Sequence, residues 1–201
     1  FYFDITKQLI PGKKNTLAVR LENLPESSRW YPGAGLYRNV HVIVTENAYI
    51  PVWGTYITTP TATKEFAKVN VQTKIVLPEG ADASKYSVTT SVWNPNGQKL
   101  TEQTIPLSQI KYNDNSLSQE FIIQTPTLWS PDMPALYSAE TRLYEGDQLK
   151  DIYTTPFGIR SIEIIPNKGF FLNGEKTVFK GVCNHHDLGP LGAAVNDAAI
   201  R

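Results

Sequence analysis

The chain has 201 residues and no net charge at neutral pH, and 41% of its residues are hydrophobic. This composition suffices to bury a core, and the balanced charge argues against strongly anionic partners such as nucleic acid or an anionic membrane surface. The single cysteine excludes an internal disulfide, and no apolar run reaches the roughly 20 residues of a membrane-spanning helix.

Residues 1–45 alternate apolar and polar side chains in three stretches, 1–5, 17–22 and 40–44. A period of two is typical of strands that bury one face and expose the other. The alternation already begins at Phe1, so we expect the chain to start within a strand. This region is therefore predicted to be the end of one β domain.

Residues 46–156 contain the clearest strand pattern, from 67 to 77, where apolar residues alternate with lysine, asparagine and glutamine. Turn residues at 94–97 and 145–147 separate strands further along the chain. We expect these strands at 86–92, 100–105, 118–123, 137–143 and 150–154. About seven short strands in roughly 110 residues are typical of an immunoglobulin-like β-sandwich, here without the cysteine pair of antibody domains.

Residues 157–201 change in character. Two apolar stretches, 170–172 and 177–182, flank Asn173-Gly174, a pair that favours a tight hairpin. A polar loop follows, and a helix is expected to begin near Asn196. A strand, a polar loop and a helix in this order predict the first βα unit of an α/β domain.

The densest polar cluster is 184–187, directly after the last expected strand. In a (β/α)₈ barrel the loops after the strands build the active site, so a histidine such as His185 could donate to a sugar hydroxyl, act as an acid or base, or bind a metal ion there. For the motif taken alone, a surface loop whose histidines cap turns is the favoured interpretation. Adjacent side chains at a strand end point in opposite directions, so His185 and His186 are not expected to share a metal ion.

Other candidate residues favour structural roles. Cys183 is expected to be a small buried hydrophobic residue. The loop at 28–35, rich in aromatic residues and glycine, could stack on sugars or pack against a neighbouring domain. Packing in the core or between domains is expected for Trp53, Trp93 and Trp129. Outward-facing carboxylates without a partner for acid–base catalysis are expected at Glu65, Glu120 and Glu140.

Several motifs, in chain order and at suitable spacing, resemble segments of glycoside hydrolase family 2. The stretch 30–40 (WYPGAGLYRNV) resembles the end of that family's sugar-binding jelly roll. The stretches 128–137 (LWSPDMPALY) and 157–163 (FGIRSIE) resemble parts of its immunoglobulin-like domain and of the exit from it. The stretches 171–174 (FLNG) and 180–185 (KGVCNH) resemble the opening of its catalytic barrel.

This resemblance implies a mainly β chain with three parts. Residues 1–45 would be the C-terminal part of a sugar-binding jelly-roll domain, and residues 46–156 an immunoglobulin-like β-sandwich. Residues 157–201 would begin a (β/α)₈ catalytic barrel. The whole enzyme would be a retaining exo-β-glycosidase that hydrolyses terminal β-linked sugars, with β-galactosidase favoured over β-glucuronidase and β-mannosidase.

The family's two catalytic glutamates lie on later barrel strands, and the acid/base residue typically follows an asparagine. This chain contains no Asn-Glu dipeptide, so the resemblance implies no catalytic residue here and an inactive fragment. The family's histidine at the end of the first barrel strand corresponds to His185. This implies that His185 contacts the substrate, with Asn184 and Asp187 beside it, although His186 stands where the family often has an acidic residue.

The alternative is a stand-alone β-sandwich module for carbohydrate binding or adhesion. The enzyme interpretation gives a carbohydrate substrate as the partner, with no cofactor, no metal ligand set, no nucleic acid and no membrane. A homo-oligomer stays open, and a bacterial periplasmic or extracellular location is expected without a visible targeting segment.

Overall fold

The computed structural model describes residues 1–26, 35–36, 38–109, 116–182 and 196–200. The chain divides into two units, which are described separately here. One unit comprises Ile43–Lys180, and the other comprises Phe1–Val42 together with Gly181–Arg201.

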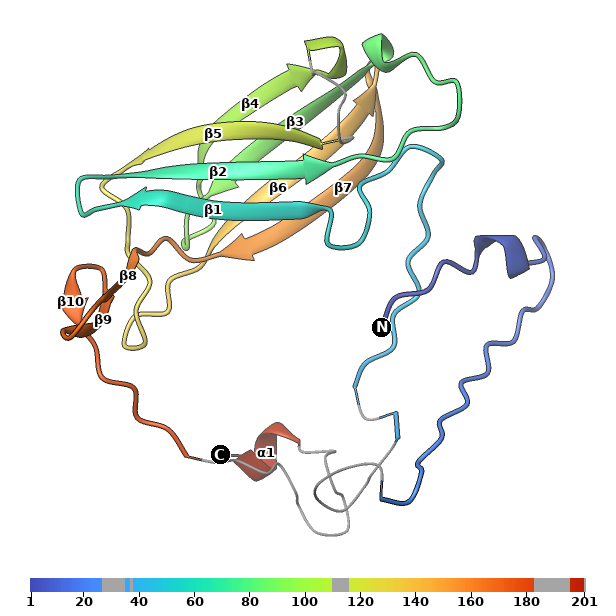
Figure 1. The fold of residues 1–201 in the computed structure, drawn as a ribbon. Helices are drawn as coiled ribbons and strands as arrows, with labels where there is room; N and C mark the ends of the chain where they lie inside the picture. Colours follow the sequence, from blue (N-terminus) through green and yellow to red (C-terminus); the bar gives the residue numbers. More distant parts are fainter. Residues whose placement is uncertain (27–34, 37, 110–115, 183–195, 201) are drawn as a thin grey trace. The chain divides into compact units, whose positions relative to one another are not determined.

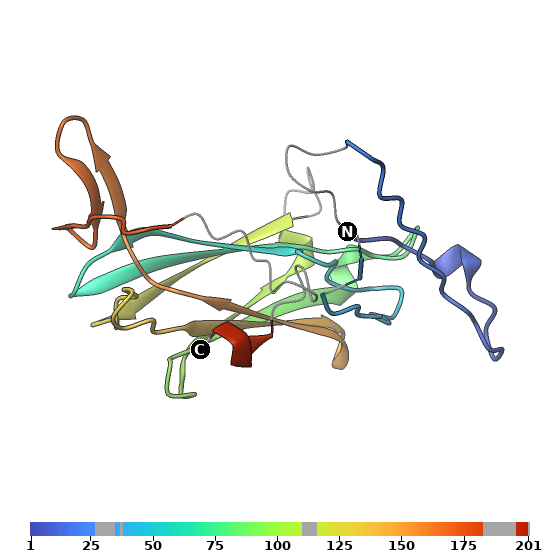
Figure 2. The same cartoon turned by 90° about the horizontal axis from the view of Figure 1, so that it is seen from below.

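The first unit contains a sandwich of two antiparallel sheets (Figures 1 and 2). One sheet has the order β1-β2-β5 and the other has the order β4-β3-β6-β7. The strands are β1 (Thr55–Ala62), β2 (Phe66–Lys74), β3 (Tyr86–Trp93), β4 (Lys99–Pro106), β5 (Ser116–Gln124), β6 (Tyr137–Glu145) and β7 (Gln148–Phe157). The short 3₁₀ turns η2 (Ala83–Lys85) and η3 (Leu107–Gln109) precede β3 and follow β4. This arrangement is mainly β and consistent with the expected immunoglobulin-like sandwich.

Six of these strands coincide with predicted ones, but β1 was missed. Its sequence, TYITTPTA, contains Pro60 and only a weak alternation of apolar residues. Proline lacks a backbone N–H group, so it disturbs a ladder of hydrogen bonds and is tolerated mainly at sheet edges. The register between β1 and β2 shifts between Thr58 and Thr61, around this proline. Pro106 in β4 and Pro156 in β7 also lie on edge strands.

A layer of polar side chains divides the core between the two sheets. The strands β2, β3, β5 and β6 each alternate buried residues, and each places one polar residue between two groups of apolar ones. Along β2 and the residue that follows it, for example, Val71 belongs to one apolar cluster and Ile75 to the other, with Thr73 between them. The polar layer consists of Thr73, Thr90, Gln119 and Thr141, all at most 1% exposed.

Most of this polar layer is held by hydrogen bonds that cross between the sheets. The Thr90 hydroxyl on β3 donates to Oε1 of Gln119 on β5 at 2.6 Å. Nε2 of Gln119 donates to the Gln103 carbonyl on β4 at 2.9 Å. By contrast, the buried Thr73 hydroxyl has no hydrogen-bond partner among the described residues. A buried polar group without a partner destabilises the fold, so the members of this layer contribute very differently to stability.

A smaller sheet, with the order β10-β9-β8, follows the sandwich (Figure 1). It consists of β8 (Ile162–Ile165), β9 (Gly169–Leu172) and β10 (Glu175–Lys176). The predicted hairpin is confirmed, because Asn173 and Gly174 form the turn between β9 and β10 with φ of 52° and 80°. The second strand of the hairpin is β10 at Glu175–Lys176, and not the stretch 177–182 that the sequence indicated. No barrel strand is seen at 177–182.

The second unit does not contain the predicted strands. Its described residues form only η1 (Thr6–Gln8) and α1 (Asp197–Ile200). The stretches 1–5, 17–22 and 40–44, of which the last extends into the first unit, are not part of any strand. Leu17, Val19 and Val42 are all more than half exposed. An alternation of apolar and polar residues indicates which side chains would share a face. A strand also needs a neighbouring strand for its backbone hydrogen bonds. The expected helix start near Asn196 agrees with α1. No helix in the described part of the chain is long and apolar enough to span a membrane.

Candidate functional site

The predicted substrate contacts lie outside the described residues. Asn184, His185 and Asp187 fall within 183–195, as does Cys183, and most of the loop at 28–35 falls within 27–34. Among the described residues, no group of three histidine, cysteine, aspartate or glutamate side chains is placed to hold a metal ion.

The scattered glutamates of the sandwich are held by cations or lie at the surface. Glu120 pairs with Lys68 at 3.5 Å, and Glu140 pairs with Arg142 at 2.6 Å. A retaining glycosidase needs two carboxyl groups about 5 Å apart, one as acid/base and one as nucleophile. An ion-paired carboxylate on the outer face of a sheet does not meet that need.

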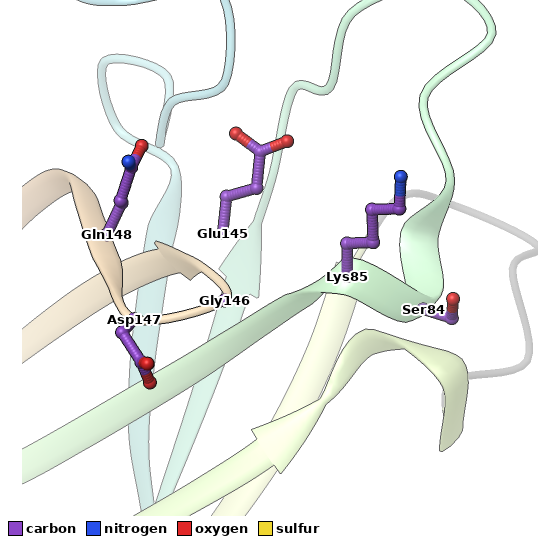
Figure 3. A pocket seen from close by; sticks show the side chains of 6 residues that line it. All are labelled: Ser84, Lys85, Glu145, Gly146, Asp147 and Gln148. Carbon is purple, nitrogen blue, oxygen red and sulfur yellow. The ribbon is translucent and has the colours of Figure 1, made fainter.

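A shallow hollow of about 700 Å³ lies where β6 turns into β7, lined by Ser84, Lys85, Glu145, Gly146, Asp147 and Gln148 (Figure 3). Figure 3 shows the Asp147 side chain pointing away from Glu145. Glu145 instead pairs with Lys150 at 3.1 Å, and this hydrogen bond is the main cause that raises the pKa of Lys150. Two carboxylates that point apart, one of them neutralised, do not form an acid–base pair. The hollow therefore has no evident catalytic role.

Trp129, in the loop between β5 and β6, is bonded to two segments that are distant in sequence. The Trp129 N–H donates to the Ile159 carbonyl at 2.8 Å, and Ile159 is completely buried. The Trp129 carbonyl accepts from Nδ2 of Asn173 at 3.0 Å. Both backbone polar groups of Trp129 are thus bonded to segments that follow β7, and this holds the loop against them.

Trp129 packs against Gly158, and Arg160 lies over its indole ring. The Arg160 guanidinium carbon lies 4.8 Å from the ring centroid, within the range of a cation–π contact. On Gly158, a Cβ atom would lie 2.9 Å from Cγ of Trp129, so only glycine leaves room for the ring. The Arg160 carbonyl also accepts from the Thr59 hydroxyl on β1 at 2.9 Å. We call Trp129, Gly158, Arg160 and Asn173 the Trp129 junction.

Asn173 connects this junction to the small sheet. Its Oδ1 accepts from the Ser161 N–H at 3.0 Å, and its own N–H donates to the Ser161 carbonyl at 2.9 Å. Figure 1 shows the β8–β10 sheet at one end of the sandwich, beside the loop that follows β5. The junction therefore joins three stretches of chain that are far apart in sequence: the loop at 125–136, the exit from β7, and the β9–β10 turn.

The sequence pointed to the parts of this junction but not to their contacts. Trp129 was expected to pack, and it is half-buried as part of the junction. Trp53 was expected to pack in the core or between domains, and at 74% exposed it is not part of the core. Asn173 was expected only as a turn residue. The two bonds of its amide are not visible from a turn motif, because one reaches Ser161, 12 residues away, and the other reaches Trp129, 44 residues away.

The chain is similar to known proteins along its whole length. Residues 49–160 match the family model described as glycosyl hydrolases family 2. The chain is 38% identical over 202 residues to the β-galactosidase BoGH2A of Bacteroides ovatus, an alignment that covers 100% of the chain and 24% of that protein. It is 29% identical over 212 residues to a β-glucuronidase of Bacteroides fragilis, covering 97% of the chain and 29% of that protein.

A solved structure gives a similar result. A β-glycosidase from Bacteroides vulgatus is similar with a TM-score of 0.71 and 32% identity, covering 84% of the chain and 21% of that structure. The chain thus spans between a fifth and a third of the length of each of these relatives.

Proposed function

Because the chain belongs to glycosyl hydrolases family 2, we propose that it is a non-catalytic part of a retaining exo-β-glycosidase that hydrolyses terminal β-linked sugars. The observation that carries this proposal is the match along the whole chain to a β-galactosidase. In this proposal, residues 1–45 complete a sugar-binding jelly roll, residues 46–156 form an immunoglobulin-like sandwich that supports the barrel, and residues 157–201 open that barrel.

Galactose is the sugar that we propose for the terminal position. The relative at 38% identity is named a β-galactosidase, whereas relatives at 34% and 29% are named a putative β-glucuronidase and a β-glucuronidase. A stand-alone binding module gains less support, because the similarity extends beyond the sandwich on both sides. A carbohydrate substrate is the proposed partner.

The purified chain of 201 residues is expected to release no p-nitrophenol above blank from the p-nitrophenyl β-galactoside. The reason is that retaining hydrolysis needs two carboxyl groups about 5 Å apart, and the described carboxylates do not supply such a pair. A longer protein that contains this chain and a complete barrel is expected to hydrolyse the galactoside in preference to the β-glucuronide and the β-mannoside. Hydrolysis by the 201-residue chain would overturn the non-catalytic role, and a preference for the glucuronide would overturn the choice of sugar.

We further propose that His185, with Asn184 and Asp187 beside it, contacts the sugar in that longer enzyme. His185→Ala is then expected to lower kcat/KM by about tenfold, the equivalent of one lost hydrogen bond of about 1.4 kcal/mol. His186→Ala is the matched control, since adjacent side chains at a strand end point in opposite directions. Steady-state kinetics of both variants decide the point, and equal losses from the two would contradict the assignment.

A further inference from the structure

Two asparagines of the small sheet adopt a backbone conformation that favours glycine. Asn167 lies in the turn between β8 and β9 with φ of 63°, and Asn173 starts the turn between β9 and β10 with φ of 52°. Asparagine tolerates this left-handed region better than most residues, so turn formation alone would explain both. The surroundings of the two side chains nevertheless differ.

The Asn173 amide is fully committed to groups outside its own turn. Oδ1 accepts from the Ser161 N–H, and Nδ2 donates to the Trp129 carbonyl, each at 3.0 Å. A backbone N–H can only donate and a carbonyl can only accept, so only one orientation of the amide satisfies both partners. In the described part of the chain, the Asn167 side chain makes no hydrogen bond. The side chain of Asn173 therefore makes two hydrogen bonds that turn formation does not require.

The partner of Asn173 is itself held firmly. Trp129 is bonded through its N–H to Ile159, and its ring is packed on Gly158 and under Arg160. Because this carbonyl is itself held in place, a hydrogen bond to it fixes Asn173 relative to Trp129. Neither residue can move without breaking other contacts. Leu172, directly before Asn173, is also only 8% exposed.

From this arrangement we propose that Asn173 is a positioning residue, which locks the β9–β10 hairpin to the sandwich and thereby fixes how the chain leaves the sandwich after β10. His185 follows Lys176, the last residue of β10, by nine positions. The coupling of hairpin to sandwich follows from the contacts above, whereas its consequence for a sugar site rests on the proposed function.

The test compares glycine and aspartate at Asn173 with the same substitutions at Asn167. Asn173→Gly keeps the turn and removes both side-chain bonds. Asn173→Asp keeps an acceptor for Ser161 but turns an oxygen toward the Trp129 carbonyl. Both aspartate and glycine are common before glycine in such turns, so a residue that only forms the turn would tolerate either change.

Hydrogen exchange of the 201-residue chain, followed residue by residue, measures the coupling directly. Amides of β9 and β10 are expected to exchange about ten- to a hundredfold faster in Asn173→Gly and about tenfold faster in Asn173→Asp. Amides of β2 and β3 are expected to keep their protection, which shows that the sandwich is still folded. The Asn167 variants are expected to change hairpin exchange by less than about threefold. Equal exchange in the Asn173 and Asn167 variants would overturn the coupling.

Kinetics of a longer enzyme that contains the chain then test the positioning. Asn173→Gly is expected to lower kcat/KM by about tenfold or more, whereas Asn167→Gly leaves it within about twofold. Faster hairpin exchange with unchanged kinetics would overturn the positioning role. An inactive wild-type enzyme whose variants show the expected exchange would instead overturn the proposed function, and the coupling would stand.

Discussion

Valine at position 73 is expected to raise the free energy of unfolding by about 1 kcal/mol, whereas valine at position 90 is expected to lower it by about 1–3 kcal/mol. The two substitutions are chemically identical, since each exchanges a hydroxyl for a methyl group of similar size. Both sites are completely buried in the same polar layer of the core. The opposite signs come only from the partners of the two hydroxyls.

The Thr73 hydroxyl is buried without a partner among the described residues, so its desolvation is not compensated. Valine removes that cost and keeps the shape. The Thr90 hydroxyl donates to Oε1 of Gln119 at 2.6 Å, and valine would leave this oxygen buried without a donor. Urea denaturation of the purified chain, monitored by circular dichroism, gives both values. A loss of stability in Thr73→Val as large as that in Thr90→Val would contradict this account of the layer.

The substitution Gly158→Ala is expected to destabilise the sandwich by about 1–3 kcal/mol, although it adds only one methyl group. A Cβ at this position would lie 2.9 Å from Cγ and 3.0 Å from Cβ of Trp129, closer than carbon atoms normally approach. The indole would have to move, and its contact with Arg160 and its bond to Ile159 limit where it can go. Trp129 fluorescence is expected to shift along with the loss of stability.

Gly181→Ala is the matched control for this prediction. No atom lies within 4 Å of the Cβ position at Gly181, and its φ is outside the left-handed region. Alanine there is expected to change the free energy of unfolding by no more than about 0.5 kcal/mol. Equal denaturation midpoints for the two variants would show that the packing of Trp129 against Gly158 does not limit stability.

The sequence predicted the strands of the sandwich well where burial is one-sided. In β2 and β5 every second residue enters the core, and the pattern is visible without knowing the partner strand. β1 was missed because it is an edge strand whose pairing shifts around Pro60. Residues 1–45 show the opposite error, because their alternation predicted strands that have no pairing partner in this structure.

The candidate sites differ in how far sequence can lead. His185 was identified from a motif and from its place after an expected strand, and its contact with a sugar stays a prediction. The roles of Asn173 and Gly158 could not be predicted, because each depends on contact with Trp129, which is brought near only when the sandwich closes. The polar layer of the core could be predicted in part. Its threonines follow the strand alternation, but which of them has a partner depends on the opposite sheet.

The positions of the prolines in the sandwich affect whether a strand of another chain can add to its outer strands. An outer strand with an uninterrupted row of free N–H and C=O groups is a template onto which a foreign strand can add. Three of the four outer strands interrupt this row with a proline, at Pro60, Pro106 and Pro156. In the described sandwich, only β5 presents an outer edge without one. Templated growth from this protein is therefore expected to start along β5.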